Sequence, residues 1–219
     1  MKQRTAPILA ACAALLLCVL QWAQPASAQS EERRAETLRK EPRVQAARLM
    51  NELMSGKALV GGPFTLTSAH GERVSLSEFR GSMVLLYFGY TFCPDVCPTD
   101  LLAIAHTLKS LGKQGDQVQP LFVTLDPARD TREVLRAYAS AFHPRIIGLT
   151  GSEDEIRRVA TAYKVFFEKV TPPGSKTYFI DHATYTFLLD RNGKYILFFP
   201  PGTPPERMVV TVREQLAEK

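Results

Sequence analysis

Two cysteines, Cys93 and Cys97, are the residues of this 219-residue sequence whose type and spacing could do chemistry most directly. On the first turn of a helix, residues four apart point the same way, so two thiolates could grip one metal ion or close a disulfide. A helix N-terminus lowers the pKa of a thiol, which favours the thiolate that both reactions need. The spacing is one residue longer than the usual redox C-x-x-C, which favours metal ligation. Two buried structural cysteines are the remaining alternative.

The other two cysteines, Cys12 and Cys18, lie in an N-terminal segment that has the features of an export signal. A short cationic start precedes an apolar run, and residues 25–28 read Pro-Ala-Ser-Ala, which fits cleavage after Ala28. An uncleaved membrane anchor is the main alternative, and a lipoprotein site at Cys12 is disfavoured because it comes too early in the run. An exported compartment is oxidising, so the remaining pair is either redox-active or kept reduced to bind a metal.

The elements around the cysteine pair can be predicted from the spacing of apolar residues. Residues 83–88 form a continuous apolar run, which is typical of a strand buried on both faces. Apolar residues then recur at helical spacing over residues 101–111. We therefore expect Cys93 and Cys97 on the loop and first helical turn between a central strand and a helix.

Strands and helices are expected to alternate along the rest of the chain. Two short strands precede the central one, and two further buried strands follow it, each leading into a capped helix. A protruding hairpin comes next, then a hairpin closed by an Asn-Gly turn, then a final helix that begins with a capping box. The expected strands lie at 64–66, 74–76, 121–125, 146–149, 165–170, 177–180, 184–189 and 195–199, and the helices begin near Asp130, Ser152 and Thr203.

The composition is that of a globular chain, with 45% hydrophobic and 22% charged residues. The net charge of +5 is too small and too dispersed to indicate nucleic-acid binding. We expect a signal peptide or membrane anchor over residues 1–28 and a linker with a lead-in helix over 29–57. Residues 58–219 then form a single α/β domain with a mixed central sheet and helices on both faces.

Residues 87–98, which read YFGYTFCPDVCP, resemble the copper site of the Sco/SenC family. The resemblance covers roughly residues 61–215 and includes Gly-Pro-Phe at 62–64, TLDPARD at 124–130 and Asp-His at 181–182. It implies a thioredoxin-like fold and assistance in assembling the binuclear copper centre of cytochrome c oxidase. It also implies that one copper ion is bound by Cys93, Cys97 and His182.

The position of His182 supports that assignment from the residues themselves. Of the four histidines, His182 alone comes directly before the strand expected at 184–189. In thioredoxin-like folds that place usually holds a cis-proline packed against the active-site cysteines, and this chain has no proline there. His70 falls at a hairpin tip, His106 lies off the apolar stripe of its helix, and His143 lies at a helix end. An imidazole at position 182 could therefore face the two thiolates.

Copper is the metal that this donor set suits best. Two thiolates and an imidazole favour Cu(I) and also tolerate Cu(II), whereas structural zinc usually takes four protein ligands. Asp181 is a candidate to orient His182 as a neighbour of the ligand, with a turn residue as the alternative. Asp126 follows a strand end, where α/β folds place functional groups, and its alternative role is a loop residue paired with Arg129.

Three functions are compatible with these residues. The first is a copper metallochaperone whose partner is the copper-bearing subunit of cytochrome c oxidase. The second is a thiol–disulfide oxidoreductase that reduces the cysteines of that subunit, and the third is a redox or copper sensor, so whether the protein is an enzyme is left open. Other periplasmic copper chaperones or thiol reductases are further candidate partners, and nucleic acid is not. The expected location is the periplasm or the periplasmic face of the inner membrane.

Overall fold

The computed structural model describes residue 51 and residues 60–218 of the chain. The expected signal or anchor over residues 1–28 lies outside these residues, as does nearly all of the expected linker over 29–57. Within the part that is described, no helix is both long enough and apolar enough to cross a membrane.

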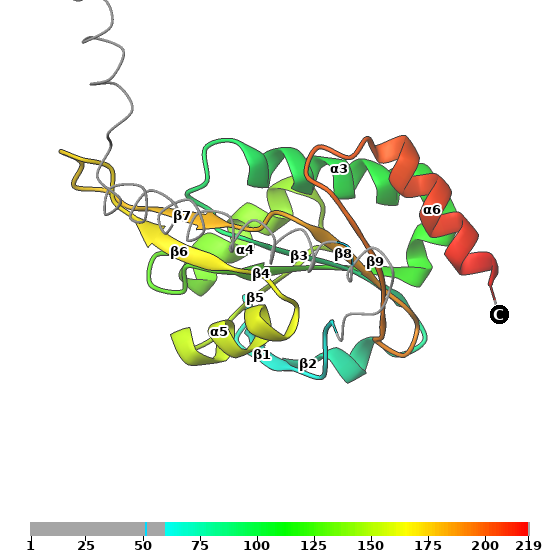
Figure 1. Ribbon diagram of the computed structural model, residues 1–219. Helices are drawn as coiled ribbons and strands as arrows, with labels where there is room; N and C mark the ends of the chain where they lie inside the picture. Colours follow the sequence, from blue (N-terminus) through cyan, green and yellow to red (C-terminus); the bar gives the residue numbers. More distant parts are fainter. Residues whose placement is uncertain (1–50, 52–59, 219) are drawn as a thin grey trace, which may run out of the picture. The chain divides into compact units, whose positions relative to one another are not determined.

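A seven-stranded mixed sheet forms the centre of the domain (Figure 1). Its strand order is β2-β1-β5-β4-β3-β8-β9, in which β3, β4 and β5 run parallel and the other neighbouring pairs run antiparallel. The sheet is therefore mixed, as expected for a thioredoxin-like domain. The strands are β1 (Thr65–Ser68), β2 (Arg73–Ser75), β3 (Met83–Gly89), β4 (Val118–Thr124), β5 (Ile147–Thr150), β8 (Thr186–Leu189) and β9 (Tyr195–Phe199).

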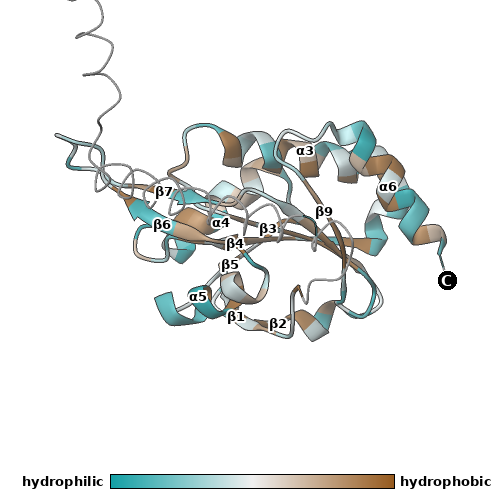
Figure 2. Ribbon diagram, in the orientation of Figure 1, coloured by the Kyte–Doolittle hydropathy of each residue, from teal (hydrophilic) through white to brown (hydrophobic). Residues whose placement is uncertain are grey.

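Helices lie on both faces of this sheet, which confirms the predicted layers. In Figure 1, α3 and α6 lie together on one side of the sheet and α5 lies on the other. Apolar residues concentrate in the sheet between these layers, and polar residues concentrate on the outer side of α5 (Figure 2). Within residues 60–218 the helices are α3 (Val96–Leu111), α4 (Arg132–Phe142), α5 (Glu153–Ala162) and α6 (Pro205–Ala217), with short 3₁₀ turns at Leu76–Phe79 and Gly112–Gln117.

Strand β3 is the centre of the core, because all seven of its residues are buried. Its parallel pairing with β4 runs from Met83 opposite Val118 to Gly89 opposite Thr124, so both strands end at the same level. The loop that holds Cys93 and the loop that follows β4 therefore leave the sheet side by side. This is the carboxyl edge of a parallel pair, where α/β folds place their functional groups.

The predicted protruding hairpin is present as a separate two-stranded sheet. Strands β6 (Phe167–Val170) and β7 (Phe179–His182) pair antiparallel, with Phe167 opposite His182. Figure 1 shows this hairpin extending beyond the main sheet. Its second strand has the expected length but lies two residues later in the chain than expected, so His182 is its last residue rather than a loop residue before the next strand.

The helix starts were predicted with mixed success. The expected capping box between Ser152 and Glu155 is present at the start of α5. A helix does begin near Asp130, but the expected cap is wrong, because Thr131 caps α4 and the Asp130 carboxylate turns inward to other partners. The capping box at Thr203 is also wrong, since its hydroxyl donates to the carbonyl of Pro200 at 2.6 Å and Pro204 occupies the cap position.

Candidate metal centre

Cys93 and Cys97 lie on the loop before α3 and on its first turn, as expected, because α3 begins at Val96. Cys97 is therefore the second helical residue, whereas Cys93 lies in the preceding loop, where its amide donates to the Tyr90 carbonyl at 3.3 Å. Both cysteines are free thiols, and their sulfur atoms are close enough to form a hydrogen bond. The loop rather than the helix thus brings the two thiols together.

Room for the sulfur of Cys97 comes from Gly89, the last residue of β3. A Cβ atom at position 89 would lie 2.9 Å from the Cys97 sulfur and 3.0 Å from the Tyr87 ring. Cys97 itself is completely buried. Gly89 is a residue that the sequence analysis overlooked, although a glycine at the end of a buried strand signals a close approach of this kind.

The two thiols have opposite pKa shifts. A hydrogen bond from Cys97 lowers the pKa of Cys93 to about 3, and a further hydrogen bond to His182 acts in the same direction against the effect of burial. The same hydrogen bond to Cys93, together with burial, raises the pKa of Cys97. The pair therefore holds one proton at neutral pH, with the thiolate on Cys93 and the thiol on Cys97.

His182 directs its Nε2 atom toward this pair. Nε2 lies 3.6 Å from the Cys97 sulfur, and Nδ1 lies 3.2 Å from the Ala183 carbonyl oxygen. Because a carbonyl only accepts, Nδ1 donates the second of these hydrogen bonds, and Nε2 is the nitrogen that faces the sulfur. The Tyr90 ring packs edge-on against the imidazole with 5.9 Å between ring centroids.

Two buried polar groups that the sequence analysis missed lie beneath the site. Asp100 is only 5% exposed, and its Oδ1 atom accepts from the Gly202 amide at 3.0 Å. Its Oδ2 atom and the Tyr87 hydroxyl have no hydrogen-bond partner of normal geometry, although each is close enough to affect the pKa of the other. Burial raises the pKa of Asp100. An acidic residue on the apolar face of α3, three positions after Cys97, was the available signal.

The two aspartates proposed as neighbours of the ligands lie in different surroundings. Asp181 is exposed and sits opposite Glu168 in the hairpin, and the group at Nδ1 of His182 is the Ala183 carbonyl. Asp126 is completely buried, and its Oδ2 atom accepts from Nε of Arg129 at 2.5 Å. The structure thus places Asp126 in the ion pair with Arg129 that was its alternative role.

The donor set fits one soft metal ion, although the site is not closed around one. Cys97 contacts both Cys93 and His182, which brings two sulfurs and one nitrogen together. Within the described residues, no three His, Cys, Asp or Glu side chains are already arranged to hold a metal ion. The ligands must therefore adjust on binding, and Cys97 must lose its proton.

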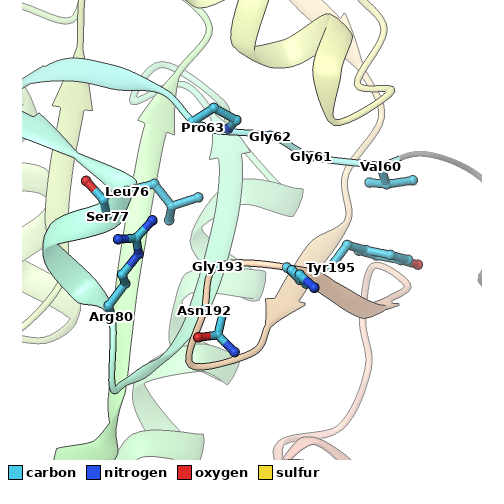
Figure 3. Close-up of a pocket in the computed structure, with 11 residues that line it drawn as sticks. Val60, Gly61, Gly62, Pro63, Leu76, Ser77, Arg80, Asn192, Gly193 and Tyr195 are labelled. Carbon is cyan, nitrogen blue, oxygen red and sulfur yellow. The ribbon is translucent and has the colours of Figure 1, made fainter.

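A cavity of about 480 Å³ lies near the other end of the strands, away from the end of β3 that leads to Cys93 (Figure 3). It is bounded by the Asn192–Gly193 turn and by Leu76 and Arg80, next to the start of β3 rather than its end. No cysteine or histidine lines it. The cavity is therefore separate from the candidate metal centre.

Comparison with known proteins gives consistent matches. The SCO1/SenC family model matches residues 52–217. An SCO2-like protein of Rickettsia prowazekii is 42% identical over 144 residues, which is 65% of this chain and 70% of that protein.

Solved structures match over the same domain. The copper-bound structure of Bradyrhizobium japonicum ScoI is 38% identical, with a TM-score of 0.66, and the match covers 71% of this chain and 99% of that one. BsSco, a member of the Sco family of cytochrome c oxidase assembly proteins, is 24% identical with a TM-score of 0.59 over 74% of this chain and 95% of its own, and it shares the fold.

Proposed function

This chain belongs to the SCO1/SenC family, and from that premise we propose that it is a copper metallochaperone. It binds one copper ion through Cys93, Cys97 and His182 and passes it to the binuclear copper centre of cytochrome c oxidase. The copper is cargo, so the protein must bind the ion and then release it to a partner. Three ligands suit that task because they leave a coordination position open to a partner's ligand.

One observation carries the proposal. The Nε2 atom of His182 lies 3.6 Å from the sulfur of Cys97, which is itself hydrogen-bonded to the Cys93 thiolate. An imidazole nitrogen next to a thiol pair is the donor set of a soft metal site, and it accommodates both Cu(I) and Cu(II).

The residues act in a definite order during capture. Cys93 is partly exposed and already a thiolate, so it meets the ion first. Cys97 then gives up its proton and joins as the second ligand, since only the thiolate binds metal. His182 completes the set from the end of β7, and the hydrogen bond from its Nδ1 atom to the Ala183 carbonyl orients the ring so that Nε2 faces the cysteines.

The partner that we propose is the copper-bearing subunit of cytochrome c oxidase. Transfer proceeds when a ligand of that subunit enters the open position and displaces these ligands in turn. The protein would act in the periplasm or at the periplasmic face of the inner membrane. Periplasmic thiol reductases would keep the cysteines reduced, and other copper chaperones would supply the ion.

A thiol–disulfide oxidoreductase is the second candidate, and the unequal thiols favour it. The Cys93 thiolate would attack a partner's disulfide, forming a mixed disulfide and releasing one partner thiolate. Cys97 would lose its proton and attack the Cys93 sulfur, which forms the Cys93–Cys97 disulfide and releases the second partner thiol. The partner is thereby reduced by two electrons and this pair is oxidised by two.

Anaerobic copper titration of reduced and of oxidised protein, with metal analysis, tests the chaperone. We expect one copper per reduced chain and none per oxidised chain, because a disulfide removes two ligands. Equal copper stoichiometry in the two states would overturn cysteine ligation. Failure of the reduced protein to bind copper, together with efficient reduction of a disulfide substrate, would replace the chaperone by the oxidoreductase.

A further inference from the structure

The loop over residues 124–130, which we call the bridging loop, leaves β4 beside the cysteine loop. It contains none of the proposed ligands, yet its side chains contact segments on both sides of the site. One set of contacts reaches the segment that carries Cys93, and the other reaches the hairpin that carries His182.

On the cysteine side, the contact is made by Asp130, which is only 1% exposed. Its carboxylate accepts three hydrogen bonds: from the Thr91 amide at 3.0 Å, from the Thr91 hydroxyl at 2.6 Å and from the Thr124 hydroxyl at 2.5 Å. Thr91 lies two residues before Cys93. Hydrogen bonds to a buried carboxylate are strong, so Asp130 fixes the start of the cysteine loop to the end of β4.

On the histidine side, Asp126 and Arg129 hold Tyr178, the residue before β7. Arg129 donates from Nη1 to the Tyr178 carbonyl at 3.0 Å, and Asp126 accepts from the Tyr178 hydroxyl at 2.9 Å. Asp126 also accepts from Nε of Arg129, so the three groups form a closed ring of polar contacts. Tyr178 lies four residues before His182, directly before the first residue of β7.

Aromatic contacts reinforce this ring. The guanidinium carbon of Arg129 lies 3.7 Å from the centroid of the Tyr178 ring and 4.8 Å from that of Phe92. Phe92 is the neighbour of Cys93, and its ring also contacts Phe179 of β7. Arg129 is thus held between the cysteine loop and the hairpin, in a geometry that only a planar guanidinium provides.

The hairpin needs such a tie. Strands β6 and β7 form their own sheet and share no strand pairing with the seven-stranded sheet in the described part of the chain. A lone two-stranded hairpin is marginally stable in water, so its position depends on contacts with the rest of the domain. Tyr178 lies at the loop end of the hairpin, next to the pair formed by Val170 and Phe179, so its contacts with Asp126 and Arg129 tie that end to the bridging loop.

Resting on the copper site proposed above, we propose that Arg129 and Asp130 are positioning residues. They hold the loop that carries Cys93 and the strand that carries His182 in the relative position that the ligand set needs. Asp130 positions the cysteine loop through Thr91, and Arg129, together with Asp126, positions β7 through Tyr178. Because the two residues are adjacent, the bridging loop fixes the separation between Cys93 and His182.

Copper affinity of variants provides the first test. Arg129→Met should weaken copper binding by about 10- to 100-fold, the usual effect of losing a residue that orients a ligand. Arg129→Lys should not restore binding, since an ammonium cannot make both the stacking and the paired contacts. In a His182→Ala background, Arg129→Met should lower copper affinity by less than a further factor of about two, because a residue that acts through His182 then has no ligand to orient.

A matched control is available in Arg73. Like Arg129, Arg73 donates hydrogen bonds to a carboxylate and to a backbone carbonyl: to Glu155 at 2.8 Å and to Thr65 at 3.1 Å. It lies on β2, away from the cysteines. Arg73→Met should leave copper affinity unchanged. A loss of affinity as large as that of Arg129→Met would show a general effect of removing an arginine and would overturn the proposal.

Hydrogen exchange of the copper-free protein tests the same idea without the metal. Arg129→Met should speed amide exchange across β7 by about tenfold, and Asp130→Asn should speed it around Thr91 instead. If Arg129→Met does not fold, Tyr178→Phe removes a single hydroxyl and should speed exchange in β7 to a smaller extent. Unchanged exchange in β7 with a folded Arg129→Met protein would overturn the proposal, whereas wild-type protein that binds no copper would overturn only the proposed function.

Discussion

Cys93 and Cys97 are chemically unequal because one is buried and because the shared proton stays on the buried sulfur. The thiolate therefore forms on the sulfur that solvent can reach. This inequality serves metal capture and thiol exchange alike, so it does not by itself decide between the two functions.

The lowered pKa of Cys93 predicts unusual reactivity with pH. A thiol with a pKa of about 3 is already fully ionised at pH 5, so its alkylation rate should change little between pH 5 and 8. An ordinary thiol, with a pKa near 9, would gain about tenfold per pH unit over that range. Iodoacetamide labelling of the reduced copper-free protein, read by peptide mass spectrometry, measures this.

Cys97 is the internal control for that labelling. Because it is buried and its pKa is raised, it should remain unlabelled over the same pH range. Labelling of Cys97 ahead of Cys93, or a rate that climbs steadily to pH 9, would contradict the assignment of the thiolate.

Gly89 gives a steric prediction at the same scale. Gly89→Ala places a methyl group 2.9 Å from the Cys97 sulfur, so the sulfur must move. We expect a loss of about 1–3 kcal/mol in the free energy of unfolding, which is typical of overpacking a core, together with weaker copper binding. Thermal denaturation and copper titration measure the two effects.

Gly148 on β5 supplies the matched variant. A Cβ there would lie 2.7 Å from Leu135, away from the cysteines, so Gly148→Ala should cost similar stability and leave copper affinity intact. Equal losses of copper affinity in both variants would mean that Gly89 acts only through stability.

At the scale of elements, the hairpin of β6 and β7 is the part that we expect to respond to copper. His182 ends β7, so its ligation would add a further link between the hairpin and the cysteine loop. Hydrogen exchange across residues 169–181 should therefore slow when copper is added to the reduced protein. An unchanged profile would mean that the site is fully formed before the metal arrives.

The sequence predicted most of these elements because their signals are local. The apolar run of β3, the Asn-Gly turn before β9 and the capping box at Ser152 each depend on a few neighbouring residues. The inward turn of Asp130 could not be predicted in the same way. Its partner, Thr91, lies 39 residues earlier, and this tertiary contact prevails over a helix cap.

The candidate site shows the same division between local and distant signals. The two cysteines and His182 could be named from residue types, spacing and family resemblance. The hydrogen bond from the Gly202 amide to Asp100 and the contacts of Arg129 with Tyr178 could not be predicted, because they join groups from segments far apart in the chain. The placement of Cys93 on the loop and of Cys97 on the first turn of α3 was predicted correctly from local spacing.

At the scale of the whole molecule, a copper chaperone should become less necessary to the oxidase when copper is abundant. Deleting the gene should lower cytochrome c oxidase activity when copper is scarce, and added copper should partly restore it, because free ions can then reach the oxidase unaided. Oxidase activity at several copper levels measures this. Unchanged oxidase activity at every level, with defects in periplasmic disulfides, would favour the oxidoreductase.

The most direct test of the central claim is X-ray absorption at the copper edge of the reduced, copper-loaded protein. The account predicts two sulfur ligands and one nitrogen ligand in the wild type. His182→Ala should lose the nitrogen and keep both sulfurs, whereas Cys93→Ser should lose one sulfur. A copper environment in which His182→Ala changes nothing, or one with no sulfur ligand, would contradict the site built from Cys93, Cys97 and His182.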